Sequence, residues 1–374
     1  MVNSTVIDWR LERIRDEAKR QGVDCIITSS PESVRYLTGA YVMTQKLIPE
    51  RLAFAVVPVT GEAWMLVCRV EEMLVRAESH VKDVRTYDEF ADDLLVSLGQ
   101  GLRHAGLDGA VVAIEELRLS AQHYQRLKAE LPRCTIVDAS TIVSNVAQIK
   151  HDDEVAILAK ATSLTVQAID SAFTQATVGT SERAVGTSIM GHLDSEGLDE
   201  VWKVIGAGER SALAHPTPRA DVSLRSGDLV RVDCGGVLDG FHSDNARNAI
   251  VGRNKQVERM YAKLAAIHEG LIESCTVGTR GSDLFSRCEK LFEKEDLPFT
   301  MPLIGHSLGI VLHEAPILTA DCELVLKPNM VLAMEPRFTL DGLRYHIEDT
   351  VQVTEDGPRL LSVDTIARHP IFVE

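Results

Sequence analysis

Two Asp-Gly dipeptides, each flanked by runs rich in branched apolar residues, are the strongest constraint on how this chain folds. Asp239-Gly240 follows the apolar run 229–234, and Asp341-Gly342 separates the runs 330–338 and 344–353. Asp-Gly favours a two-residue hairpin turn, because both turn residues must adopt positive φ angles. The second half of the chain is therefore expected to contain two tight β-hairpins.

The first hairpin is expected to bring two aspartates to one face of its sheet. With Asp-Gly as the turn, Asp233 faces Ala246, and Asp244 lies one diagonal step away on the same face. Diagonal neighbours are about 7–8 Å apart at the backbone, which is close enough for two carboxylates to share a cation. Gly235-Gly236 is also compatible with a bulge that would shift this register.

The second hairpin sets Glu335 directly opposite Glu348. Like charges that face each other across a ladder are destabilising. Either one of the two carboxyl groups is protonated, or a cation lies between them. A divalent metal ion is the simpler explanation.

Two histidines lie between the hairpins, in the segment GHSLGIVLHEAP. The small neighbours of His306 let the backbone approach a ligand closely. A lone histidine is more often structural, but here His313 follows only seven residues later. We interpret His306 as a metal ligand and His313 as a nearby donor to a substrate or intermediate.

Two further histidines precede predicted ligands. His215, in SALAHPTP, is framed by Pro216 and Pro218, which favour a rigid loop that holds a substrate-facing imidazole; a plain loop histidine is the alternative. His346 stands two residues before Glu348, so it projects to the same strand face and is expected to line the substrate pocket.

Four carboxylates and one imidazole suit two divalent ions. Oxygen-rich ligation without thiolate favours Mn²⁺, with Co²⁺, Fe²⁺ and Zn²⁺ as alternatives. Centres with two ions about 3.5–4 Å apart hold a water or hydroxide that attacks a carbonyl or phosphoryl group. A single acidic residue near a turn is usually just solvated, but two carboxylate pairs with a Gly-His motif between them favour a metal centre. The predicted ligands are Asp233, Asp244, His306, Glu335 and Glu348.

Composition excludes several classes of function. Lys and Arg total 39 against 55 Asp and Glu, and the net charge of −16 argues against nucleic acid or an anionic membrane as the main partner. Seven scattered cysteines without a CxxC motif are typical of a reducing compartment. The charged N-terminal segment lacks a signal-peptide core, and no run approaches 18 apolar residues. We therefore expect a soluble, cytoplasmic protein.

At 374 residues the chain is long enough for two domains. Residues 1–147 alternate helical and strand-like segments, which predicts a small α/β domain; residues 148–374 predict an α+β domain, with helices on one face of a largely antiparallel sheet and the metal ligands on the other. Asp152 or Asp153 is expected to cap the helix that opens the second domain. Helices are expected at 6–21, 31–36, 88–104, 120–131, 155–174, 181–196, 256–274 and 282–293, and strands at 24–28, 52–58, 63–67, 109–114 and 135–138, in addition to the hairpins.

For most of the remaining histidines, and for Cys234, the neighbouring residues do not indicate a functional role. Cys234, next to Asp233, points to the opposite strand face and is expected to pack rather than to bind metal. His242 is an exception, since it flanks a predicted ligand. For the other histidines a solvated surface position is expected: His80, His104, His123, His151, His192, His268 and His369.

These motifs resemble the pita-bread metallopeptidase family, in particular its prolidase and aminopeptidase P branch with a creatinase-like N-terminal domain. The shared pattern is an Asp, a second Asp eleven positions later, GHxxGxxxHE, a Glu in a MEP-like segment, and IEDTVxVTEDG. The resemblance implies a creatinase-like domain over 1–147 and a pita-bread catalytic domain over 148–374. It also implies that the five predicted ligands bind two metal ions, bridged by Asp244 and Glu348.

The activity that the resemblance implies is hydrolysis of the Xaa-Pro amide bond in dipeptides or short peptides. A hydroxide that bridges the two ions attacks the carbonyl, Glu335 acts as the general base and passes the proton to the proline nitrogen, and His313 steadies the oxyanion. His215 and His313 resemble the substrate-side histidines of the family. A homodimer is implied as well, because relatives complete the active-site rim with a neighbour's N-terminal domain.

Four positions depart from the family pattern. His346 replaces an Arg, Ala246 replaces a Thr, Ser307 replaces a Gly, and Arg337 stands where the sequence EPG is common. The departures leave open a family member with non-peptidase chemistry on a small metabolite, such as amide or amidine hydrolysis or carbon–sulfur lyase chemistry. A non-catalytic binding module and a metal-free creatinase are disfavoured, because all five ligands are present.

Overall fold

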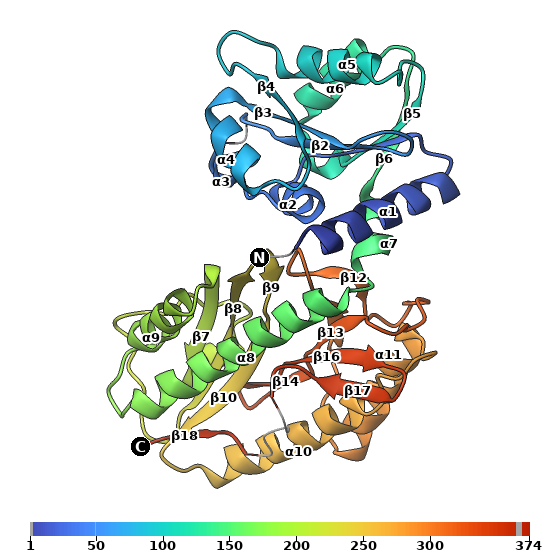
Figure 1. Ribbon diagram of the computed structural model, residues 1–374. Coiled ribbons are helices and arrows are strands. Elements are labelled where there is room, and N and C mark those ends of the chain that lie inside the picture. Colours follow the sequence, from blue (N-terminus) through green and yellow to red (C-terminus); the bar gives the residue numbers. More distant parts are fainter. Residues whose placement is uncertain (1–2, 49, 364–368) are drawn as a thin grey trace. The chain divides into compact units, whose positions relative to one another are not determined.

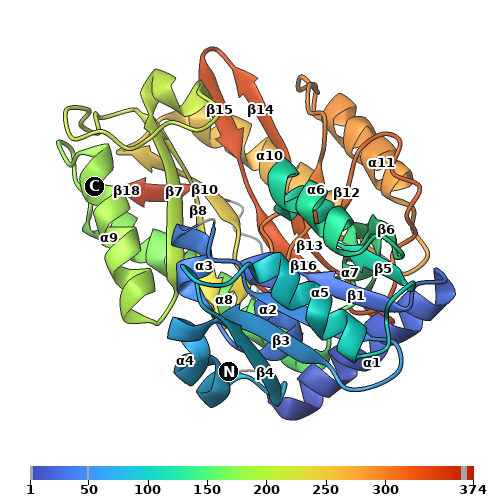
Figure 2. The same ribbon diagram turned by 90° about the horizontal axis from the view of Figure 1, so that it is seen from above.

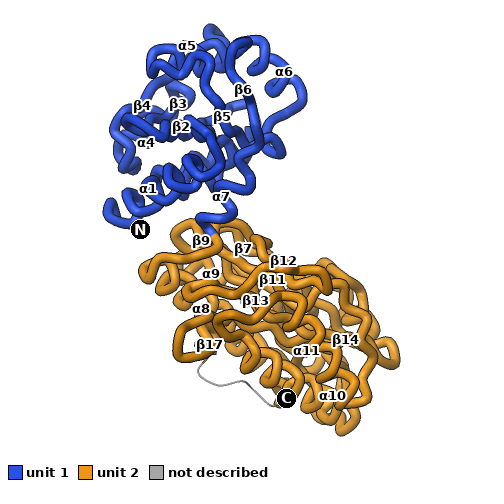
Figure 3. The backbone as a smooth tube through the Cα atoms, turned by 90° about the vertical axis from the view of Figure 1, so that its right-hand side faces the viewer, with its two compact units in different colours: residues 1–147 blue, residues 148–374 orange. Residues whose placement is uncertain are grey.

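The computed structural model describes residues 3–48, 50–363 and 369–374. The chain folds into two compact units, Met1–Ala147 and Gln148–Glu374, which are coloured separately in Figure 3. Each unit has its own hydrophobic core. Within the three described ranges, no helix is long and apolar enough to cross a membrane.

The first unit alternates helices and strands, as predicted for an α/β domain. Its elements are α1 (Ser4–Arg20), β1 (Cys25–Thr28), α2 (Pro31–Thr38), α3 (Met43–Leu47), β2 (Phe54–Pro58), β3 (Trp64–Cys68), α4 (Glu72–Glu78), β4 (Asp83–Tyr87), α5 (Leu94–His104), β5 (Val111–Ile114), α6 (Ala121–Glu130), β6 (Thr135–Asp138) and α7 (Ser140–Ala147). The strands form one sheet in the order β4-β3-β2-β1-β5-β6. Cys25 and Ile27 of β1 join leucines of α5 and α6 in one core, and Figure 1 shows α1 and α2 on the other face of the sheet.

The second unit contains two five-stranded sheets. Its elements are α8 (Asp152–Gln175), α9 (Glu182–Ser195), β7 (Asp199–Ala207), β8 (Leu229–Leu238), β9 (Phe241–His242), β10 (Asn245–Val251), α10 (Lys255–Ile272), α11 (Gly281–Lys294), β11 (Gly305–Ser307), β12 (Glu314–Ile317), β13 (Val331–Met334), β14 (Arg337–Leu340), β15 (Leu343–His346), β16 (Asp349–Thr354), β17 (Gly357–Leu360) and β18 (Ile371–Val373). One sheet has the order β18-β10-β8-β7 with β9 paired to β8, and the other has the order β12-β11-β13-β16-β17.

Each sheet of the second unit has its own helical layer. Helices α8 and α9 share a core with β7, β8 and β10, whereas α10 and α11 share a core with β13 and β16 (Figure 1). The α+β class agrees with the prediction, but the single sheet with helices on one face was wrong. The second hairpin breaks halfway along: β13 and β16 belong to the second five-stranded sheet, whereas β14 and β15 form a separate two-stranded ribbon.

The first predicted hairpin forms with the expected register. Asp233 pairs with Ala246, and the pairing continues unshifted to the end of β8. The two turn residues have φ angles of 50° and 90°, as this turn requires. A side chain at Gly235 would collide with the carbonyl group of Ser243, so close approach of the two strands, rather than a bulge, explains this glycine.

The second predicted hairpin forms in two segments instead of one continuous ladder. β13 pairs with β16 and β14 pairs with β15, with the same register on both sides of the break. Glu335 and Glu348 lie in that break. Pro336 has no N–H to continue the ladder, which explains why the strand stops there. The β14–β15 ribbon contacts α10 and runs beside it, as Figure 2 shows.

The predicted helices agree with the observed ones to within three residues, except for the start of one helix, and one predicted cap was wrong. The helix predicted at 88–104 begins at Leu94, because the side chain of Asp93 caps it. Helix α8 is capped by His151 rather than by Asp152 or Asp153: the His151 side chain accepts from the N–H of Asp153, and Glu154 completes a capping box. The elements that were not predicted are helices α3, α4 and α7 and strands β4, β7, β11, β12, β17 and β18.

Candidate metal centre

The five predicted ligands converge from both sheets of the second unit. Asp233 lies on β8 and Asp244 immediately precedes β10, while His306 lies on β11. Glu335 follows β13, and Glu348 precedes β16. An isolated β-bridge between β10 and Glu348 joins the two sheets at this point. Residues that are far apart in the sequence therefore meet in one cluster.

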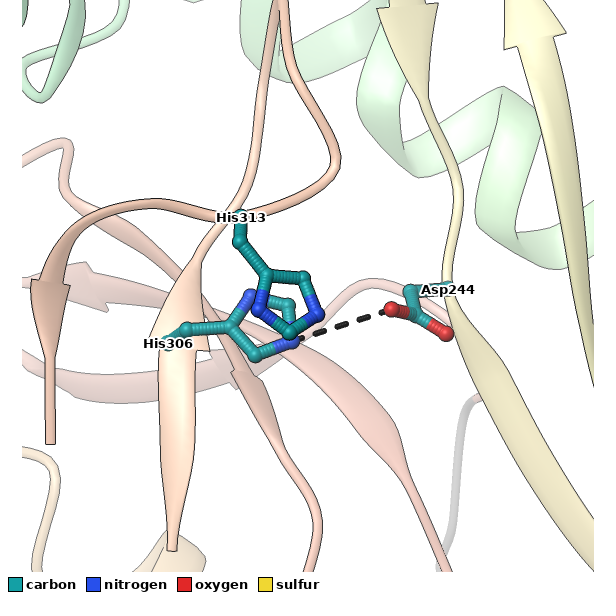
Figure 4. A group of neighbouring side chains, drawn as sticks. All are labelled: Asp244, His306 and His313. Carbon is teal, nitrogen blue, oxygen red and sulfur yellow. Dashed lines mark ion pairs between the residues drawn. The ribbon is translucent and has the colours of Figure 1, made fainter. Parts of the chain in front are cut away.

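Two imidazoles face the carboxylates of this cluster. Nε2 of His306 lies 3.7 Å from Oδ2 of Asp244, as the dashed line in Figure 4 shows, and 3.9 Å from Oε1 of Glu348. Nε2 of His346 lies 3.9 Å from the other oxygen of Glu348, Oε2. The two oxygens of Glu348 thus face two different imidazoles. This arrangement suits a carboxylate shared between two ions.

The pKa values of the carboxyl groups in this cluster are strongly raised. Desolvation raises the pKa of Asp233 to about 6 and the pKa of Glu335 to about 7. Desolvation, together with repulsion from the neighbouring carboxylates, raises the pKa values of Asp244 and Glu348 well above their usual range. Among the described residues, Oδ1 of Asp244 and Oε1 of Glu348 have no hydrogen-bond partner. These oxygens fit divalent cations, which would supply the missing positive charge.

His306 is oriented by its own neighbour. Its Nδ1 lies 3.0 Å from the carbonyl oxygen of Ser307, which leaves Nε2 facing Asp244. Desolvation lowers the pKa of His306 to about 4, so the ring is neutral near pH 7 and offers a lone pair. The ring of His313 stacks on it with centroids 3.9 Å apart (Figure 4). His313 is exposed, so it can meet a ligand.

His215 lies on an exposed loop that the first ligand strand holds in place. Arg231 of β8 is buried, and its Nη2 donates to the carbonyl oxygens of Leu213 and Ala214, at 2.8 and 2.7 Å. Desolvation raises the pKa of Asp233 and lowers that of His313; the charge of His215 acts on both groups, partly offsetting the first shift and adding to the second. The predicted substrate-side histidine is therefore within electrostatic range of the cluster.

A buried lysine that the sequence pattern did not indicate supports the loop between the two motif histidines. Nζ of Lys150 donates to Oγ of Ser307 at 3.2 Å and to Oε2 of Glu314 at 2.8 Å. Oγ of Ser307 in turn donates to the carbonyl oxygen of Val331 at 3.0 Å. Ser307, which departs from the family pattern, thus ties β11 to β13. Lys150 stands in a mostly polar segment, which gave no sign of burial.

The sequence analysis also did not identify Arg247, a second residue that supports the cluster. Arg247 donates from Nη1 to the carbonyl oxygen of Glu348 at 2.7 Å, and its Nη2 lies 2.5 Å from Oδ1 of Asp349.

His268, expected on the surface, is instead fully buried. Its Nε2 lies 3.3 Å from the carbonyl oxygen of Met334 and 3.7 Å from Oδ2 of Asp349. That expectation was wrong because α10 packs this face against the second sheet. The only sequence feature that could have indicated these buried contacts is that Asp349 directly follows Glu348, a predicted ligand.

Two of the departures from the family pattern face each other. Arg337 and His346 are direct cross-strand partners in the β14–β15 ribbon. Arg337 forms an ion pair with Glu335, and its charge opposes the effect of burial on the pKa of that carboxyl group. His346 is only 2% exposed and lies among Asp233, Glu335 and Glu348. It is therefore part of the cluster, not only of the pocket wall. The third departure, Ala246, is fully buried opposite Asp233.

An α/β unit followed by a two-sheet α+β unit with clustered carboxylates defines the class: a pita-bread protein with a creatinase-like N-terminal domain. The chain belongs to metallopeptidase family M24. The model of that family matches residues 156–355, and the model of the creatinase/prolidase N-terminal domain matches residues 10–149. The predicted family is confirmed, and the protein is an enzyme of the peptidase type.

Its relatives match nearly the whole chain. The Xaa-Pro dipeptidase of Pyrococcus horikoshii is 25% identical over 369 residues, which cover 96% of this chain and 97% of the relative. The probable dipeptidase PepE of Mycobacterium tuberculosis is 28% identical over 331 residues, or 86% and 85% of the two chains. The crystal structure of dipeptidase PepE from Mycobacterium ulcerans matches with a TM-score of 0.85 at 24% identity, over 100% of this chain and 99% of that one. The recombinant prolidase of Thermococcus sibiricus has a TM-score of 0.86 at 21% identity, over 98% of each chain. These structural matches show a shared fold.

Proposed function

We propose that this protein is a dinuclear metallopeptidase that hydrolyses the Xaa-Pro amide bond of dipeptides or short peptides. The observation that carries the proposal is the position of Glu348, whose two oxygens each lie 3.9 Å from a different imidazole. Relatives named as Xaa-Pro dipeptidases support the choice of substrate.

The proposed ligands are the five side chains that converge between the two sheets. When bound, the two divalent ions supply a Lewis acid and an activated water at neutral pH. Four carboxylates and one imidazole favour Mn²⁺ over Co²⁺, Fe²⁺ and Zn²⁺. Glu348 and Asp244 would be shared between the ions, with the remaining ligands to either side. The proposed set is Asp233, Asp244, His306, Glu335 and Glu348.

Glu335 is the proposed general base. Its carboxylate lies at the break in the second hairpin, beside Arg337 on the following strand. From there it would take a proton from the attacking water and deliver it to the leaving proline nitrogen. Arg337 forms an ion pair with one oxygen of the Glu335 carboxylate, which leaves the other oxygen free to transfer the proton.

His313 and His215 are the proposed substrate-side groups. Desolvation and the nearby charge of Arg337 lower the pKa of His313, so its ring is neutral near pH 7 and carries one N–H. A single N–H directed at the carbonyl oxygen would stabilise the negative charge that develops there. His215, on the proline-framed loop, would orient the peptide from the other side.

Release of proline from a panel of Xaa-Pro dipeptides by Mn²⁺-loaded protein tests the proposal. Wild type should turn over, and Glu335→Ala should lose on the order of 10²–10⁴-fold in kcat, the usual contribution of a general acid–base group. Glu323→Ala removes an exposed carboxylate and serves as the matched control, with unchanged rate. Absence of proline release by wild type with two ions bound would overturn the dipeptidase proposal and direct the search to longer peptides and small metabolites.

The departures at His346 and Arg337 favour one second candidate, a hydrolase or lyase that acts on a small metabolite. Desolvation lowers the pKa of the His346 ring well below its usual range, and the charges of Arg337, Arg231 and Arg344 lower it further. Positive charge on this side of the cluster suits a compact anionic substrate. Amides, amidines and thioethers of small acids belong on the same assay panel.

The proposed setting is a cytoplasmic homodimer. All seven cysteines are free thiols, and five of them are buried, which fits a reducing compartment. Sedimentation velocity would measure the oligomeric state directly, and a single monomeric species at micromolar concentration would exclude the dimer.

A further inference from the structure

His346 occupies an unusual position for a buried histidine. Its Nε2 lies 3.6 Å from Oε2 of Glu335 and 3.9 Å from Oε2 of Glu348, and its Nδ1 lies 3.8 Å from Oδ2 of Asp233. Among the described residues, neither ring nitrogen has a hydrogen-bond partner. Buried polar atoms are normally satisfied, so two such atoms on one ring indicate a missing ligand.

The backbone fixes where this ring points. The N–H of His346 donates to Oδ1 of Asn248 at 2.8 Å, which ties the end of β15 to β10. Across the ribbon, the guanidinium group of Arg337 is engaged by Glu335. The imidazole is thus held among three carboxylates, one of which, Glu335, also pairs with the guanidinium group of its cross-strand partner.

The spacing suits a shared cation better than direct hydrogen bonds. Distances of 3.6–3.9 Å between nitrogen and oxygen are too long for a hydrogen bond. Two ligand atoms that each lie about 2.1 Å from one ion are at most about 4.2 Å apart. Asp233, His346 and Glu348 can each offer one ligand atom such that all lie within 4.8 Å of one another, so a closure of a few tenths of an ångström would bring them onto one ion.

We propose that His346 is a direct metal ligand, together with Asp233 and Glu348. The inference rests on the proposed dinuclear centre and adds a sixth ligand to it. On the other side of Glu348 the corresponding group comprises Asp244, His306 and His313. Of these, Asp244 and His306 belong to the proposed ligand set, so each half then has one proposed imidazole ligand. A second nitrogen donor shifts the preference of the centre from Mn²⁺ toward Co²⁺ and Zn²⁺, which bind imidazole more strongly.

The test compares two replacements at position 346. His346→Phe fills the space without a donor atom, whereas His346→Asp keeps a ligand of another type. Bound Co²⁺ and Zn²⁺ are measured by calorimetric titration and by elemental analysis after dialysis. Loss of an outer-shell partner usually weakens metal affinity by about 10–100-fold, so we expect His346→Phe to lose at least about 100-fold at one of two sites and His346→Asp to retain both. His104→Ala, an exposed histidine of the other unit, is the control for adventitious binding.

A spectroscopic readout counts the ligands independently of activity. X-ray absorption of the Zn²⁺-loaded protein should show two imidazoles per two ions in wild type and one in His346→Phe. Two tightly bound ions and an unchanged imidazole count in His346→Phe would overturn the inference, even if wild type releases proline. Two imidazoles without proline release would instead overturn the dipeptidase proposal alone. If His346→Phe fails to fold, the imidazole count of Zn²⁺-loaded His346→Asp still decides the question: one fewer imidazole than in wild type supports the inference, and an unchanged count overturns it.

Discussion

Lys150 and Glu314 form a buried ion pair, with Nζ and Oε2 2.8 Å apart and the lysine side chain only 1% exposed. The other oxygen of Glu314 accepts the N–H of Ile310 at 2.6 Å and that of Val311 at 3.3 Å. The pair therefore closes the loop that leads from β11 to His313, the residue next to Glu314. Lys150, which is far from the ligands in sequence, therefore helps to set the position of His313, a proposed substrate-side histidine.

Removal of one partner of this pair should be costly. Lys150→Met leaves an uncompensated buried carboxylate, so the free energy of unfolding should fall by about 3–5 kcal/mol. The double variant Lys150→Met, Glu314→Gln should recover a large part of that loss, because no charge remains buried. Urea denaturation measures both variants, and equal losses in the single and double variants would show that the charge is not the cause.

Metal affinity should rise with pH between about 5.5 and 7.5. Asp233 and Glu335 have pKa values raised to about 6 and about 7, so below these values a cation must displace their protons. His306, with a pKa lowered to about 4, is already neutral throughout this range and adds no pH dependence. Titration with Mn²⁺ at several pH values measures the slope, and a flat profile would contradict the protonated state of the carboxylates.

The same groups predict how the stability of the metal-free protein varies with pH. A carboxyl group whose pKa is raised by folding binds more protons in the folded state, so its contribution to stability falls as pH rises from its ordinary pKa to the raised one. For Asp233 that window runs from 3.8 to about 6, and for Glu335 from 4.5 to about 7. The increase in Tm caused by a fixed excess of Mn²⁺ should therefore be larger at pH 7.5 than at pH 5.5.

Replacement of Arg247 should weaken metal binding without removing a ligand. Its guanidinium group contacts the carbonyl oxygen of Glu348 and the carboxylate of Asp349. In Arg247→Met the strand end that carries Glu348 loses this support, and metal affinity should fall by about 10–100-fold. Calorimetry gives the affinity, and Arg253→Met, an exposed arginine that follows the same strand, should leave it unchanged.

Two glycine substitutions should change stability in opposite directions. In Gly235→Ala the new Cβ meets the carbonyl group of Ser243 across the first hairpin, which forces the strands apart and should cost at least about 1–3 kcal/mol. Gly191 lies inside α9 with open space beside it, so Gly191→Ala should stabilise by about 0.5–1 kcal/mol. Thermal unfolding of both variants tests whether close strand approach explains Gly235.

The two hairpin registers could be predicted because each is set locally. Asp-Gly turns fix the pairing of the adjoining strands, so the partner of Asp233 follows from residue numbers alone. The break beside Glu335 could not be predicted from residue numbers, because it depends on how Pro336 and the two sheets divide the ladder. The amphipathic helices were predictable for the same local reason, and their caps were less so, as His151 shows.

By itself, the sequence determined the set of candidate ligand side chains and the hairpins that position them, since turn geometry and strand alternation act over a few residues. Only the tertiary structure decided that the two hairpins meet at Glu348, that His346 enters the cluster, and that Lys150 and His268 are buried. The backbone carbonyl of Glu348 is held by Arg247, 101 residues earlier in the chain. Contacts of that range arise from the packing of whole sheets and helices, and no local pattern encodes them.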